Sequence, residues 1–111
     1  MMKQNKSKTN NKEPLLVKDS SVHGLGLFAN KFFAAGTLIG VFEGFVTEEN
    51  DIHVLWIEDD HGWTGLNVTN NLKYANHSKK PNSYLEKTSM YALVDILEGD
   101  EIFFDYGDEW E

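Results

Sequence analysis

Short apolar segments separated by turn residues recur along the chain from Pro14 onward. The segments are rich in Val, Ile, Leu and aromatic residues, and Gly, Asp, Asn or Ser lie between them, which is typical of strands joined by tight turns. Only Asn71–Ala75 suggests a helical turn. The pattern therefore predicts a mainly β domain. The expected strands are Leu15–Lys18, Thr37–Thr47, Ile52–Glu58, Ser83–Lys87, Met90–Ile96 and Glu101–Tyr106.

Glycines interrupt this pattern at two places. Gly24 and Gly26 are separated by one residue, and glycine allows backbone conformations and close approaches that a side chain blocks. Gly40 and Gly44 fall inside the expected strand Thr37–Thr47. We expect bends or bulges there.

Residues 1–12 differ in composition from the rest of the chain. After Met2 they contain no apolar residue, so we expect a disordered polar tail. The whole chain of 111 residues is the size of one modest domain, which makes residues 13–111 a single domain. The absence of cysteine excludes disulfides, a thiolate zinc cluster and a thiol nucleophile.

The charge distribution favours a basic partner. All ten basic residues are lysines, and arginine, which most often contacts phosphate and guanine with two hydrogen bonds, does not occur. From residue 13 onward six lysines stand against 18 acidic residues, a net charge of −12. Such a field attracts cations and repels nucleic acids, although an acidic surface also serves simply to keep a small protein soluble. We expect no direct binding of nucleic acid.

The sequence gives no indication of a membrane-spanning segment or of a metal site. No apolar run approaches the ~20 residues that cross a bilayer, and the N-terminus lacks the apolar stretch of a secretory signal. We expect a soluble, intracellular protein. His53 and His61 show no ligand spacing with other histidines, so no metal site is expected.

Four short motifs occur in a fixed order. They are His23-Gly24-Leu25-Gly26-Leu27-Phe28-Ala29, Phe42-Glu43-Gly44, Lys73-Tyr74-Ala75-Asn76-His77-Ser78-Lys79-Lys80-Pro81-Asn82 and Glu101-Ile102-Phe103-Phe104-Asp105-Tyr106-Gly107. In combination they resemble the SET-domain family over roughly residues 14–111. The third is the most specific, because it looks like the family's Asn-His-Ser-Cys-x-Pro-Asn signature. Lys79 stands in place of the cysteine there, and Phe42 stands where the family usually has the tyrosine of Tyr-x-Gly.

Two departures indicate a subtype. The family's cysteine-rich flanking modules are missing, and the stretch between Gly44 and Asn76 is short, so the insert that often helps to grip the peptide is nearly absent. In both respects the chain looks like the small stand-alone SET proteins of some viruses and bacteria. The viral relatives act as homodimers, which makes a homodimer a hypothesis by analogy. The expected location is the cytoplasm, or the host nucleus if the source is viral.

The resemblance implies an enzyme that transfers a methyl group from S-adenosylmethionine to a lysine of a basic protein, such as a histone tail. A free lysine amine has a pKa of ~10.4, so the site must favour the uncharged amine through desolvation and the nearby sulfonium. A carboxylate beside the amine would work against this. The reactive pocket should therefore be aromatic.

The expected walls of the lysine channel are two aromatic residues of the last motif, Phe104 and Tyr106, and Trp110, which follows the motif. Tyr106 is the expected catalytic residue, because its phenol can orient reacting groups, although such a tyrosine is elsewhere often only a buried strand-end residue. Phe104 lies on the same face of the strand. In the family this position influences how many methyl groups are added, and phenylalanine predicts di- or trimethylation; a core phenylalanine is the alternative. Trp110 could cover the adenine or wall the channel.

The cofactor-binding residues are likewise implied by the resemblance. Asn76 and His77 match the family residues that hold the amino-acid and adenine parts of S-adenosylmethionine, while an Asn-His turn is the ordinary alternative. The backbone of His23, Gly24 and Leu25 should contact the methionyl portion, and a tight hairpin is the alternative there.

The implied architecture is a β-clip-like SET fold of several small curved sheets. Its C-terminal strand passes beneath a loop as a pseudoknot, which brings Asn76, His77 and Tyr106 together. Two other functions remain open. One is a non-catalytic SET-like module that binds lysine-rich tails, because Phe42 and the missing flanks leave its pocket incomplete. The other is a structural protein that does not bind S-adenosylmethionine.

Overall fold

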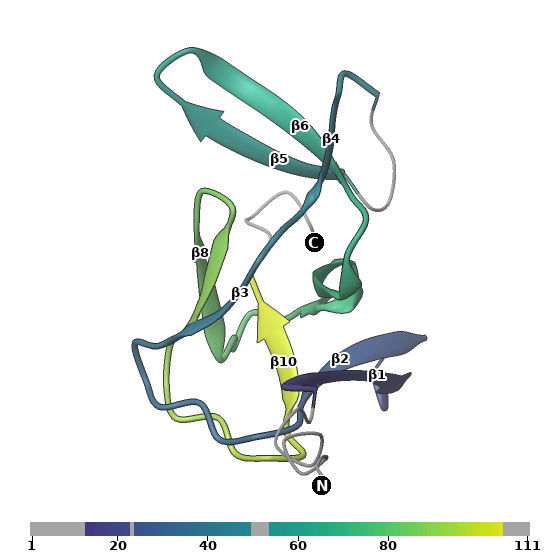
Figure 1. The fold of residues 1–111 in the computed structure, drawn as a ribbon, viewed down its shortest axis with the longest axis vertical. Coiled ribbons are helices and arrows are strands. Elements are labelled where there is room, and N and C mark those ends of the chain that lie inside the picture. The colour runs from purple at the N-terminus through teal and green to yellow at the C-terminus, as the bar shows by residue number, and fades with distance from the viewer. Residues whose placement is uncertain (1–12, 23, 50–53, 106–111) are drawn as a thin grey trace, which may run out of the picture.

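The structure is a computed structural model that describes residues 13–22, 24–49 and 54–105. In this part of the chain ten strands form three small sheets, and a single 3-10 turn, η2 (Asn71–Tyr74), lies at the predicted helical turn (Figure 1). The predicted fold class, a mainly β domain of several small sheets, is confirmed. The tail predicted for residues 1–12 lies outside the described residues.

The first sheet gathers strands from both ends of the chain in the order β1-β2-β10-β7. The β1–β2 hairpin is closed by a hydrogen bond from the Ser20 backbone N–H to the Gly24 carbonyl oxygen (2.7 Å). Gly24 has a φ of +49°, a backbone conformation that favours glycine. The strands are β1 (Leu15–Asp19), β2 (Leu25–Ala29), β7 (Asn76–His77) and β10 (Glu101–Phe104).

The second sheet has the order β3-β9-β8 and consists of β3 (Leu38–Val41), β8 (Ser83–Glu86) and β9 (Ser89–Ala92). The register between β3 and β9 shifts between Leu38 and Gly40. The irregularity expected at Gly40 is therefore confirmed.

The third sheet has the order β4-β6-β5 and lies at the upper end of the molecule in Figure 1. A Cβ atom on Gly44 would overlap the backbone of Asn67 on the neighbouring strand, so the close approach of β4 and β6 requires glycine. The strands are β4 (Gly44–Thr47), β5 (Val54–Asp59) and β6 (Gly62–Val68).

The expected single strand Thr37–Thr47 is wrong. The segment forms β3 in one sheet and β4 in another, and the break falls at Phe42 and Glu43. Phe42 is only 5% exposed. Burial of this large ring against the core outweighs the continuation of a regular strand.

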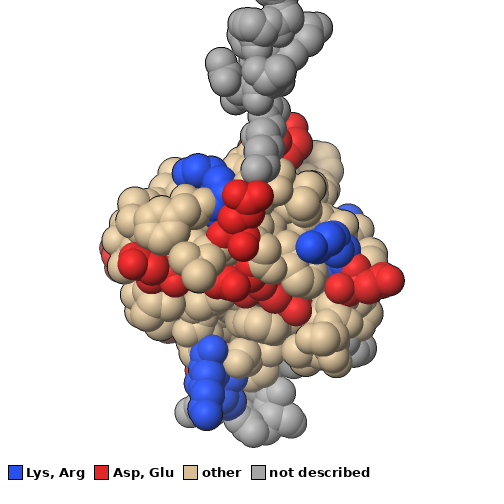
Figure 2. All heavy atoms as spheres, turned by 90° about the horizontal axis from the view of Figure 1, so that it is seen from below, with Lys and Arg blue, Asp and Glu red and all other residues tan. Residues whose placement is uncertain are grey.

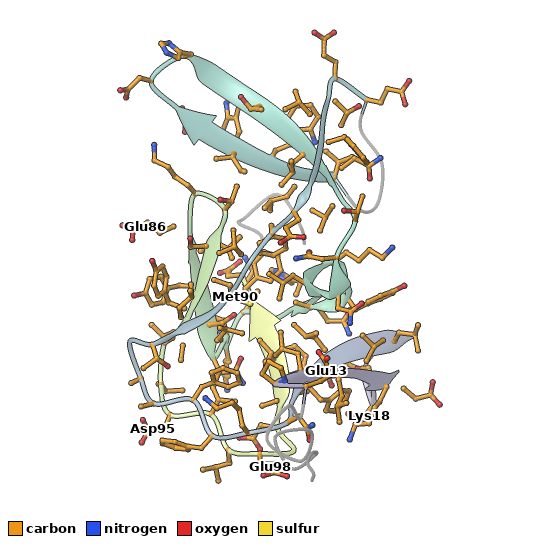
Figure 3. All side chains as sticks on the ribbon, viewed as in Figure 1. Glu13, Lys18, Glu86, Met90, Asp95 and Glu98 are labelled. Carbon is orange, nitrogen blue, oxygen red and sulfur yellow. The ribbon has the colours of Figure 1, made fainter. Side chains whose placement is uncertain are left out.

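The core lies between the first two sheets and is formed by alternate residues of their strands. Met90 on β9 is labelled near the centre of Figure 3 and is fully buried. The other largest fully buried apolar side chains come from β2, from β10 and from the loop before β10: Leu27, Ile102 and Ile96. Because β10 belongs to this core, its position is fixed by packing as well as by its hydrogen bonds.

No helix within the described ranges is long and apolar enough to cross a lipid bilayer.

Candidate active site

Strand β10 is the element around which three of the sequence motifs meet. It runs antiparallel to β2, where Ile102 lies opposite Leu27, and parallel to β7, where Phe103 lies opposite Asn76. The Gly-x-Gly segment, the Asn-His pair and the last motif therefore share one sheet. Since β7 and β10 are separated by the whole β8–β9 hairpin in sequence, only the tertiary fold brings them together.

The Asn76 side chain joins these motifs directly. Its Nδ2 donates hydrogen bonds to the Leu25 carbonyl oxygen and to Oε2 of Glu101, both at 3.1 Å. A carboxamide has two N–H hydrogens, and two contacts of this kind fix the orientation of its plane. The direction of the Asn76 carbonyl oxygen is thereby fixed as well.

The Glu101 carboxylate is the second centre of this network, and sequence reasoning missed it. Its two oxygens accept hydrogen bonds from the Ser20 hydroxyl at 3.0 and 2.8 Å, in addition to the bond from Asn76. A Cβ atom on Gly26 would collide with this carboxylate. The second glycine of the Gly-x-Gly segment therefore makes room for Glu101, and the spacing of two glycines was the sequence signal for such an approach.

Asn82 holds β10 in place through its side chain. Sequence reasoning missed this role too, although Asn82 is the last residue of the signature motif. Its Nδ2 donates to the Glu101 carbonyl oxygen, and its Oδ1 accepts from the Phe103 backbone N–H, both at 2.8 Å. The Ser83 hydroxyl donates to the Phe103 carbonyl oxygen at 2.7 Å. These side chains satisfy backbone groups of β10.

Charged side chains gather where β10 ends. Asp105 Oδ1 lies 3.7 Å from His77 Nδ1 and 3.8 Å from Lys79 Nζ. Lys79, which occupies the position of the signature's cysteine, thus takes part in an ion pair. Both side chains of this pair are partly exposed, so its contribution to stability is small.

Phe104 is buried and packs against another ring of the motifs. It is 5% exposed, and its ring centroid lies 6.2 Å from that of Phe42 in an edge-to-face arrangement. Rings at this distance attract each other through their charge distributions. The phenylalanine that departs from Tyr-x-Gly therefore contributes an apolar surface next to Phe104.

The turn that contains Gly24 leaves backbone accessible. Within the described part of the chain, a Cβ atom on Gly24 would meet nothing within 4 Å, and Leu25 at the start of β2 is exposed. The predicted hairpin and the predicted cofactor contact are therefore compatible, because the turn that closes the hairpin also presents its backbone outward.

Three predicted site residues, His23, Tyr106 and Trp110, lie outside the described residues, and so does the path of the chain beyond β10 that the pseudoknot requires. The structure thus brings together Asn76, His77, Leu25 and the Phe104 strand. Among the described residues no three His, Asp or Glu side chains form a group that could hold a metal ion.

The acidic residues are unevenly distributed over the surface. Figure 2 shows the end of the molecule opposite the third sheet, where acidic side chains form a band and the lysines lie toward its margins. Glu13, Asp95 and Glu98 belong to this end in Figure 3. The surface agrees with the net charge of −12 that the sequence gives for residues 13–111.

These features define a mainly β domain in which an Asn-His strand pairs in parallel with the last described strand and an asparagine braces that strand. A family model described as SET domain matches residues 24–107. The chain therefore belongs to the SET-domain family. No curated protein matches the sequence significantly.

Solved structures with the same fold include known methyltransferase proteins. A Plasmodium falciparum protein provisionally described as a histone methyltransferase superposes with a TM-score of 0.69 at 23% identity, covering 89% of this chain and 97% of that chain. The methyltransferase domain of human histone-lysine N-methyltransferase SETMAR gives 0.74 at 21% identity, covering 86% and 45%. The structure of ctPRC2 in an autoinhibited conformation bound to S-adenosylmethionine gives 0.74 at 21% identity, covering 91% and 16%. At these identities the likeness shows the fold.

Proposed function

We propose that this chain is a protein-lysine N-methyltransferase that uses S-adenosylmethionine and acts on a lysine of a basic protein. The observation that carries the proposal is the network in which Asn76 contacts both the Gly-x-Gly strand and Glu101 of β10. Membership of the SET-domain family and the S-adenosylmethionine-bound structural neighbour support it.

The residues around Asn76 fit this cofactor. Its oriented carbonyl oxygen suits an ammonium group, and the backbone at Gly24 is open to a ligand. His77, His23 and Leu25 would complete the binding site. When bound, S-adenosylmethionine supplies the electrophilic methyl group.

The chain's own residues would prepare the target amine. The apolar rings of Phe42 and Phe104 disfavour a charged ammonium, because burial in such surroundings opposes ionisation. Tyr106, two residues beyond Phe104, would orient the neutral amine with its hydroxyl and ring, and Trp110 would cover the channel. Positioning supplies most of the catalysis.

The test is transfer of a radiolabelled methyl group onto a lysine-peptide array, with Tyr106→Phe as the control variant. We expect label on lysine peptides and a loss of at least roughly 100-fold in rate for Tyr106→Phe. Tight cofactor binding, measured by calorimetry, should persist in this variant. Absence of transfer by the wild-type chain to any lysine peptide or basic protein would contradict the proposal.

The second candidate is a non-catalytic module that binds lysine-rich tails. Phe42 favours it, since the hydroxyl of the family's usual tyrosine is missing from the apolar cluster around Phe104. This candidate predicts peptide binding without methyl transfer, whether or not S-adenosylmethionine binds. The array and the calorimetry together distinguish the two functions.

Three finer statements are part of the proposal. A histone tail is the expected substrate, the relation is to the small stand-alone SET proteins of viruses and bacteria, and the chain acts as a homodimer. Sedimentation velocity at several concentrations tests the last, and a single monomer species at all of them would contradict it.

A further inference from the structure

The part of the chain that holds β4, β5 and β6, residues 44–68, contains six acidic residues and neither lysine nor arginine. We call it the β4–β6 lobe. One face of its sheet packs toward the core through Leu55 and Leu66. The opposite face, the outer face, is made of a different kind of side chain.

The strand register places three aromatic residues on the outer face, because residues opposite one another in antiparallel strands project to the same side. Strand β6 projects Trp63 and Gly65 in succession, with Glu58 opposite Trp63 and Trp56 opposite Gly65. On β4, Phe45 pairs with Asn67, which lies two residues after Gly65 on β6 and therefore on the same face. Trp63 is 64% exposed and Phe45 72%. Trp63 is therefore a surface residue.

Gly65 shapes this surface. A Cβ atom there would come within 2.9 Å of the Trp56 ring, so glycine allows the indole to lie across the central strand. An aromatic side chain held in this way loses little conformational entropy when a ligand binds.

Elsewhere in the described ranges, three aromatic rings lie beneath lysine side chains of the chain itself. The ammonium nitrogens lie 4.5 to 5.3 Å from the ring centroids, within the range of cation–π attraction. The pairs are Lys18 with Phe28, Lys31 with Phe33, and Lys73 with Tyr74. The β4–β6 lobe presents the same kind of ring, and residues 44–68 contain no lysine.

We infer that the outer face of the β4–β6 lobe binds a lysine-rich segment of a partner protein, away from the lysine that reacts. Trp63 and Phe45 supply the π faces, and Glu58, opposite Trp63, supplies negative charge. A second copy of the chain fits this face less well, because two lobes with six acidic residues each would repel one another. That the partner is the methylation substrate rests on the proposed function, whereas the affinity for a cationic segment does not.

The experiment measures binding of a fluorescein-labelled peptide of alternating Lys and Gly residues by fluorescence anisotropy, without cofactor. The variants Trp63→Thr and Phe45→Thr keep a residue that suits a strand and remove one ring each. We expect each to weaken binding about 5-fold, which corresponds to an exposed cation–π contact. Val46→Thr is the matched control, because Val46 is 75% exposed and lies on the other face of β4; its affinity should stay within 2-fold of wild type.

A second peptide with every lysine acetylated has the same length and no lysine charge, and it should bind at least 10-fold more weakly. Equal affinity for both peptides, or an unchanged affinity of Trp63→Thr, overturns the inference. A Trp63→Thr variant that no longer dimerises in sedimentation velocity but keeps its peptide affinity also overturns the inference. The outer face would then be a contact between copies of the chain. Calorimetry with S-adenosylmethionine on the same variants should show unchanged cofactor binding, which separates this inference from the proposed function.

Discussion

At the scale of single residues, the candidate site depends on how polar groups are paired around β10. Asn76 can present its carbonyl oxygen in one direction because both Leu25 and Glu101 hold its Nδ2. Glu101 in turn is held by Ser20 and fits against Gly26. On the proposed function, Glu101 would act on the cofactor through Asn76, as a positioning residue.

Replacement Glu101→Gln tests this role. Glutamine removes the negative charge and one of the two acceptor oxygens, so the hydrogen bonds that Ser20 and Asn76 donate are no longer charge-assisted. A hydrogen bond to a charged group contributes about 1.5 kcal/mol, and we expect the dissociation constant of S-adenosylmethionine to rise roughly 10-fold. Isothermal titration calorimetry measures it. Glu86→Gln, a change of an exposed carboxylate on β8 (Figure 3), is the control, and an equal effect in both variants would argue against the role of Glu101.

Phe104→Tyr tests the apolar cluster on the premise of the proposed function. The added hydroxyl would enter a buried site next to Phe42, where it can hold a water molecule and hinder further methylation. We expect products to shift toward monomethyl-lysine, with a loss of stability of about 1 to 3 kcal/mol if the hydroxyl finds no partner. Mass spectrometry of the methylated peptide gives the product distribution. An unchanged distribution would count against Phe104 as a wall of the lysine channel.

At the scale of elements, β10 is a short strand that is held by both backbone and side-chain hydrogen bonds. It pairs with β2 and β7 through backbone, and with Asn82 and Ser83 through side chains. Four residues of strand would be marginal alone, and the side-chain bonds extend its network. Asn82 thus stabilises the sheet through its side chain, although it belongs to no strand that pairs with β10.

We expect Asn82→Ala to lower the free energy of unfolding by about 2 to 4 kcal/mol, because it leaves the Glu101 carbonyl and the Phe103 N–H without their partner. For a domain of this size that corresponds to a fall in Tm on the order of 10 °C or more. Thermal unfolding followed by circular dichroism measures it. Asn30→Ala is the control, since Asn30 donates a single exposed hydrogen bond, to the Glu13 carbonyl. Similar losses in the two variants would show that Asn82 does not brace β10.

Most elements could be predicted from the sequence, because their apolar runs are bounded by turn residues. The exceptions have physical causes. Strands β2, β6 and β7 were not among the expected strands. In β6, Gly65 and the polar residues Thr64 and Asn67 dilute the apolar pattern, and pairing with two neighbours compensates for them. Of the candidate site, the sequence predicted only those residues whose role the resemblance to the family implies. Glu101 and Asn82 act through partners such as Ser20 that are remote in sequence, and local pattern gives no information on such contacts.

At the scale of the whole molecule, the long-range field of the acidic residues differs from the short-range contacts that hold the candidate site together. Acidic side chains form a band at the end shown in Figure 2, and the β4–β6 lobe at the other end carries acidic residues without any lysine. A field of this kind acts over distances near the Debye length, which is about 10 Å at 0.1 M salt and about 3 Å at 1 M. The hydrogen bonds of Asn76 act over distances of 3.1 Å, where salt screens little.

The two kinds of interaction therefore predict different salt responses for the two ligands. Between about 0.05 and 0.5 M NaCl we expect the KM for a lysine-rich peptide to rise at least roughly 5-fold, because screening removes the long-range attraction to the acidic surface. The dissociation constant of S-adenosylmethionine should change less than about 2-fold, and kcat should stay constant, since positioning of the amine depends on local contacts. Steady-state kinetics with the peptide varied, together with calorimetry for the cofactor, measures all three. A KM independent of salt would mean that the charge of −12 on residues 13–111 serves solubility alone and that recognition of the substrate depends on short-range contacts.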